Sequence, residues 1–105
     1  MKNNKYKINL EQDRPIINIL GEICWGFQID NFQEKIGVKK EIAETLLERL
    51  LNEEKAGIIE TYLDDAEVEI VKRGLNEVEK EIEEWELHTR IGVSLKKIKE
   101  IAIFK

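Results

Sequence analysis

The sequence predicts one mostly helical α+β domain, built from two degenerate strand–helix–helix–helix repeats that pack with pseudo-twofold symmetry. Three observations support this. The chain has 105 residues, 42% of them hydrophobic, which suits a single domain with one core. Apolar residues alternate with polar ones in two short segments and recur at helical spacing elsewhere. A shift of 55 residues aligns the halves, so we expect one domain, 1–105, with repeats at about 5–56 and 57–105.

The first repeat is expected to begin with a half-buried strand. Residues 5–10 alternate between apolar and polar side chains, which is the period of a strand with one face in the core. Asp13 and Pro15 then favour the start of a helix, because Asp caps free backbone amides and Pro fits the first turn. Gly26 is expected to loosen or end this helix.

Two more helices complete the first repeat. Residues 31–35 predict a short helix, followed by a turn at Gly37. Residues 39–55 predict a long helix with leucines on one face, and Gly57 follows it at the position where glycine commonly ends a helix.

The second repeat is expected to follow the same order. Residues 58–63 predict a strand, and Asp64 and Asp65 favour the helix start that comes next. The cleanest amphipathic pattern of the chain follows, at Val68, Val71, Leu75, Val78, Ile82 and Trp85. This spacing places Trp85 on the buried face of one long helix. Ser94 is expected to cap a last helix.

The match between the halves keeps its phase over most of the repeat. At a shift of 55, the sequence IGV at 36–38 falls on IGV at 91–93, and Leu20 falls on Leu75. The strands match with a slip of two residues, which sets Ile8 against Thr61. A lone strand leaves its backbone groups unpaired, so we expect the two strands to pair with each other.

Charge and cysteine content narrow the functional classes. The net charge of −5 opposes the phosphates of nucleic acid and anionic lipid surfaces, and suits a basic protein partner. The single cysteine excludes an internal disulfide and points to a reducing cytoplasm. No segment is apolar for long enough to cross a bilayer, so we expect no membrane association.

The two repeats differ at positions that indicate a binding surface. Residues 64–86 contain ten acids and three bases, and the acids we assign to partner binding are Glu79, Glu83, Glu84 and Glu86. Trp25 occupies the position that Lys80 holds in the second repeat, and we assign it to the same surface as an apolar anchor. The alternatives are a solvated acidic helix face and a Trp25 that packs on the other repeat or on the first strand.

No pattern of catalytic or metal-binding residues is present in the sequence. Cys24 and His88 are the only thiol and the only imidazole, and their separation gives no nucleophile–base pair. One histidine among glutamates is a poor zinc site, and no phosphate-binding loop occurs. We therefore expect no catalysis, no cofactor and no metal.

A DNA-binding regulator is the alternative function. Residues 32–50 and 87–103 each resemble the helix-turn-helix of bacterial DNA-binding proteins, with Gly37 and Gly92 at the turns. In the second unit Lys96, Lys97 and Lys99 would contact phosphates.

The segments LNEV at 75–78 and WELHTRIGVS at 85–94 look like a pattern in short bacterial proteins. Together with the small size and acidity, the chain is similar to immunity proteins of bacterial polymorphic-toxin systems. This resemblance implies a non-catalytic inhibitor that binds a basic toxin, often a nuclease, and blocks its active site. A phage inhibitor of a host defence enzyme would make the same physical demands and is a second alternative.

Overall fold

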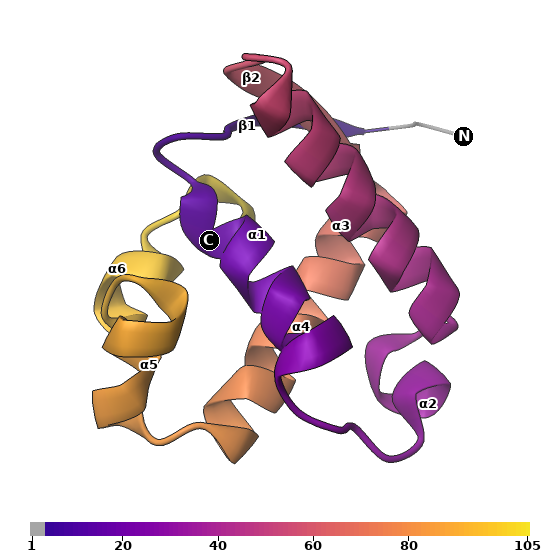
Figure 1. Ribbon diagram of the computed structural model, residues 1–105, viewed down its shortest axis with the longest axis vertical. Coiled ribbons are helices and arrows are strands. Elements are labelled where there is room, and N and C mark those ends of the chain that lie inside the picture. Colours follow the sequence, from indigo (N-terminus) through magenta and orange to yellow (C-terminus); the bar gives the residue numbers. More distant parts are fainter. Residues whose placement is uncertain (1–3) are drawn as a thin grey trace.

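The computed structural model describes residues 4–105, and its order of elements is strand, then helices, in each half of the chain (Figure 1). The elements are β1 (Lys5–Asn9), α1 (Arg14–Gly21), the π-helical turn η1 (Glu22–Gly26), α2 (Phe32–Ile36), α3 (Lys40–Lys55), β2 (Glu60–Asp64), α4 (Asp65–Glu81), α5 (Glu84–Ile91), α6 (Leu95–Lys99) and the 3-10 turn η2 (Ala102–Phe104). The predicted mostly helical α+β fold is confirmed, whereas the duplication of the two halves stays a prediction.

The two strands form an antiparallel pair at one end of the molecule (Figure 1). The register runs from Lys5 opposite Asp64 to Asn9 opposite Glu60, so the predicted pairing of the strands is confirmed. Ile8 and Leu63 point into the core from this ladder. The second strand begins at Glu60, two residues later than expected.

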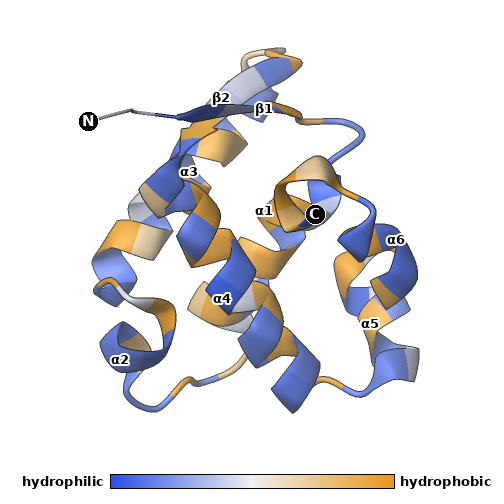
Figure 2. Ribbon diagram, turned by 180° about the vertical axis from the view of Figure 1, so that it is seen from behind, coloured by the Kyte–Doolittle hydropathy of each residue, from blue (hydrophilic) through white to orange (hydrophobic). Residues whose placement is uncertain are grey.

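Helices α1 and α4 lie against each other at the centre of the molecule. Their contact includes Gly74, where an added Cβ would lie 3.2 Å from Ile19 Cγ2 and 3.1 Å from Ile23 Cδ1. Helix α1 is apolar along most of its length, while α4 carries a hydrophilic side (Figure 2). This difference arises because α3 and α5 also pack on α1.

Most predicted helix ends are confirmed, with one difference in how α1 begins. Asp64 and Glu67 form a reciprocal capping box at the start of α4, and Ser94 accepts a hydrogen bond from the Lys97 amide at the start of α6. Asp13 precedes α1 as expected, but its carboxylate accepts a hydrogen bond from the Asn9 amide, at 2.8 Å, and does not cap the helix.

The prediction of one continuous helix through Trp85 is wrong. The chain leaves helical geometry at Ile82, whose φ and ψ are −112° and 127°, and re-enters it at Glu84. A continuous helix would place Glu79 beside Glu83 at the unfavourable i,i+4 spacing of like charges. The break shifts the helical phase, so that Leu87 enters the core and Trp85 faces solvent.

Two glycine substitutions test the backbone of this fold. Gly92, after α5, has a φ of 101°, so Gly92→Ala should destabilise the protein by about 1–2 kcal/mol through left-handed strain. Gly21 has helical angles and open space at its Cβ, so Gly21→Ala should stabilise by about 0.5–1 kcal/mol. Urea unfolding measures both changes, and equal effects of the two substitutions would contradict the assignment of these turns.

Candidate protein-interaction surface

The most exposed large apolar side chain among the described residues lies at the junction of α4 and α5. Trp85 is 72% exposed, and its indole N–H donates a hydrogen bond to Glu83 Oε2 at 2.9 Å. We call this junction the acidic corner, formed by Glu81, Glu83, Glu84, Trp85 and Glu86. An exposed indole surrounded in sequence by carboxylates combines an apolar contact surface with a negative field.

Sequence reasoning missed Trp85 as a surface residue, because its spacing continued the apolar face of α4. The signal that could have found it is the charge pattern. A helix that continued from Glu77 to Glu86 would stack carboxylates at i,i+4 spacing along both flanks, which disfavours continuation.

The four glutamates assigned to partner binding do not form one ridge. Glu83 and Glu84 are exposed at the acidic corner, in the region that joins the two helices. Glu86 lies 4.0 Å from the Arg90 guanidinium, one helical turn further along α5. Glu79 is on α4 and pairs with Lys99 at 3.3 Å. The break between α4 and α5 therefore separates Glu79 from the other three along the backbone.

Trp25 is exposed at the end of the π-helical turn η1. Its indole is 59% exposed, and its N–H donates to Glu44 Oε2 of α3 at 3.3 Å. Helix α3 covers the preceding part of this face, including Ile17, but leaves most of the indole in solvent. The alternative in which Trp25 is covered by the other repeat or by the first strand is wrong.

Gly26 makes the tight turn beside Trp25 possible. A Cβ at this position would collide with the Glu22 carboxylate. That carboxylate pairs with Arg90 of α5, which also donates to the Gly26 carbonyl at 3.3 Å. Because Arg90 also lies near Glu86, this one side chain connects the Trp25 region with the acidic corner.

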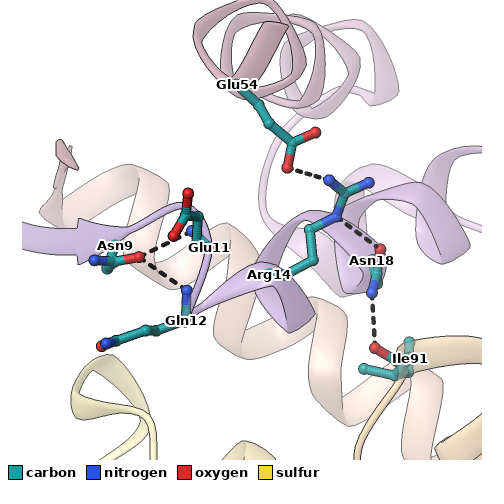
Figure 3. Close-up of polar contacts among 7 residues, drawn as sticks. All are labelled: Asn9, Glu11, Gln12, Arg14, Asn18, Glu54 and Ile91. Atoms are coloured by element: carbon teal, nitrogen blue, oxygen red, sulfur yellow. Dashed lines mark hydrogen bonds and ion pairs between the residues drawn. The ribbon is translucent and has the colours of Figure 1, made fainter. Parts of the chain in front are cut away.

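A shallow hollow of about 330 Å³ lies beside Trp25, between α1, α3 and α5. Polar contacts across these helices hold its wall, as Figure 3 shows. Arg14 pairs with Glu54, and Arg14 Nε donates to Asn18 Oδ1 at 3.4 Å. Asn18 Nδ2 donates to the Ile91 carbonyl at 2.7 Å. Both arginines of the hollow, Arg14 and Arg90, already face carboxylates, so the hollow offers little net positive charge.

The lysines of the DNA-binding alternative lie on a very short helix. Lys96 and Lys97 are exposed on α6, which has five residues. Lys99 pairs with Glu79, so one residue of the basic set and one of the acidic set share an ion pair. The structure thus joins two surfaces that the sequence treated as alternatives.

The two residues considered for nucleophilic chemistry are in different environments. Cys24 is buried, and burial, followed by the nearby Glu44 carboxylate, raises the pKa of its thiol to about 11. His88 is exposed on α5. Within residues 4–105, no group of three or more His, Cys, Asp and Glu side chains is arranged to hold a metal ion.

Comparison with protein-family models, curated proteins and solved structures gives no significant match to this chain. Among the described residues, none of the helices has the length and apolarity needed to cross a membrane.

Truncation of Trp85 tests whether this side chain is free of a role in stability. Because Trp85 is mostly in solvent, Trp85→Ala should change the free energy of unfolding by less than about 0.5 kcal/mol. The matched control is Leu87→Ala in the same helix, which should cost about 2–5 kcal/mol since Leu87 is 2% exposed. Denaturant unfolding of both variants gives the values, and a cost above about 2 kcal/mol for Trp85→Ala would place the indole in the core.

The Cys24 thiol should react slowly in the native protein. With its pKa raised from 9.0 to about 11, little thiolate is present at pH 8, and an aromatic disulfide reagent should label it far more slowly than in urea. The unfolded chain loses this proton at lower pH than the native chain does. The free energy of unfolding therefore falls as pH rises from about 9 toward 11. Equal labelling rates in native and unfolded protein would contradict the burial.

Proposed function

We propose that this chain is a non-catalytic protein-binding module that engages a basic protein partner through the acidic corner. The observation that carries the proposal is the position of Trp85, which is 72% exposed and flanked by Glu83, Glu84 and Glu86. A large exposed indole is costly in water and gains free energy when a partner covers it. Tryptophan is also the residue type most enriched among interface hot spots.

The surrounding carboxylates give the surface its preference among partners. They lie in a chain with a net charge of −5, so the local field and the whole-molecule field have the same sign. Opposite charge on the partner would speed encounter and fix its orientation, while the indole would slow dissociation. Trp25 provides a second apolar contact, connected to the acidic corner through Arg90 and Glu86.

Within this class, we propose an immunity or inhibitor role in the cytoplasm. Such a protein needs a preformed surface complementary to a basic enzyme, such as a toxin nuclease, and no chemistry of its own. A phage inhibitor of a host defence enzyme would use the same surface. The ion pair between Lys99 and Glu79, together with the short α6, favours a protein partner over DNA.

The test begins with capture of the partner from lysate of the source cells at low salt, followed by its purification. Association and dissociation rates are then measured with the native protein and two quadruple variants. One variant changes the assigned acids, Glu79, Glu83, Glu84 and Glu86, to Gln. The control changes four exposed glutamates of other elements, Glu11, Glu34, Glu41 and Glu48, to Gln. Both variants lose four negative charges, so they separate local complementarity from net charge.

We expect the first variant to associate about tenfold more slowly at low salt and the control variant about two- to threefold more slowly, with the difference shrinking as salt rises. Trp85→Ala should increase the dissociation rate by about tenfold or more. Equal association rates of the two quadruple variants would overturn the acidic corner as the binding surface. Retention of DNA alone, lost as salt rises, would instead support the regulator.

A further inference from the structure

Two ion pairs between the halves of the chain have the same form when the halves are exchanged. Glu22 of the first half pairs with Arg90 of the second half at 2.5 Å. Glu77 of the second half pairs with Lys35 of the first half at 4.0 Å. Glu77 follows Glu22 by 55 residues, and Arg90 follows Lys35 by 55 residues. Each half therefore supplies the acid of one pair and the base of the other.

The two glycine turns obey the same relation. Gly37 lies against Arg73, where an added Cβ would be 3.1 Å from the guanidinium. Gly92 lies against Asn18, where an added Cβ would be 3.7 Å from the amide nitrogen. Both glycines have φ near 100°, and each partner also follows its counterpart by 55 residues. A side chain from the same position of the opposite central helix thus reaches each turn.

Contacts near the centre of the molecule match themselves under this exchange. Ile19 meets Gly74, and these residues are 55 apart. The β-ladder is centred on Lys7 opposite Tyr62, which are also 55 apart. Exchange therefore relates Ile8 to Leu63, without the two-residue slip that the sequence comparison required.

The helices follow the same reciprocal arrangement. Helix α2 of the first half packs on α4 of the second, and α5 of the second half packs on α1 of the first. The ion pairs and turn contacts above lie in these two places. Each half therefore completes the interior of the other half.

From these contacts we infer that the two halves meet through an internal twofold interface, which a second copy of this chain fits. Two chains would exchange halves, so that the first half of each packs on the second half of the other. The charges are complementary across this interface in both directions, since each half carries one acid and one base of the two pairs. Every contact described above would form again between chains.

The connection between the halves has the properties that exchange requires. Residues 56–59 are exposed, and Gly57 has a φ of 83° with open space at its Cβ. Ile58 and Ile59 are 43% and 51% exposed, although both are large and apolar. Extension of this hinge alone converts an intrachain pair of halves into an interchain pair. The single-chain form prevails in dilute solution, where the tethered half has the higher effective concentration, and exchange increases with protein concentration.

Two charge-reversed variants test the exchange directly. One carries Glu22→Lys and Glu77→Lys, and the other carries Lys35→Glu and Arg90→Glu. In either variant alone, like charges meet at both places between the halves. In a heterodimer with exchanged halves, opposite charges meet at every place again. The two variants are unfolded together, refolded at high protein concentration and analysed by native mass spectrometry and by thermal unfolding.

We expect a one-to-one heterodimer, at twice the mass of the 12.3 kDa chain, in about tenfold excess over either homodimer. The matched control mixes Glu69→Lys with Arg73→Glu. That pair lies within α4, so exchange of halves cannot restore it, and no excess of heterodimer is expected. A heterodimer fraction equal to that of the control would overturn the inference.

A second measurement covers the case in which neither charge variant folds, alone or mixed. Deletion of Ala56 and Gly57 from the otherwise unchanged chain shortens the hinge, so the halves of one chain no longer reach each other in the native arrangement. Light scattering should then give a dimer with the helical content of the native protein. A folded monomer would overturn the inference, and so would loss of folded protein at all concentrations.

Discussion

Ile19 and Ile23 of α1 pack against the α4 backbone at Gly74, and the positions of the other elements follow from this contact. A larger residue at Gly74 would separate the two helices, although glycine in a helix interior costs about 1 kcal/mol relative to alanine. The close approach lets fully buried side chains of both helices share one core, including Leu20 and Val71. Burial of each such residue contributes about 1.5–3 kcal/mol, which exceeds the cost of the glycine.

The remaining helices and the strand pair cover this central contact unequally. Helix α3 is 16 residues long and packs on α1, so α1 can be apolar on most of its surface. Helix α6 has five residues, and the face of α4 that corresponds to the α3-covered face of α1 carries Lys72 and Lys80 in solvent. The difference in helix length therefore agrees with the difference in polarity. Trp25 lies where α3 leaves the apolar face of the first half incompletely covered.

The exposed tryptophans are in regions that the core does not require. Trp85 follows the break between α4 and α5, and Trp25 ends a π-helical turn that Gly26 allows to close tightly. π-Helical turns are often found at functional sites. Carboxylates near both indoles accept their N–H groups, which orients the rings without burying them. Preformed, rigid aromatic contacts reduce the entropy lost on binding, and this suits a small protein whose role is recognition.

The sequence by itself determined the element types, the strand ends of the repeats, the caps at Asp64 and Ser94 and the turns at Gly37 and Gly92, because these depend on residues near one another in the chain. The mostly helical fold and the pairing of its strands could be predicted for the same reason. Only the tertiary structure decided the fate of the apolar positions near a helix end. Periodicity could not show that the chain breaks at Ile82, since no glycine or proline marks the place and the competing terms are core packing of Leu87 and repulsion among glutamates. Exposure of Trp25 and Trp85, and the pairing of Glu79 with Lys99, likewise depend on residues brought together from distant segments.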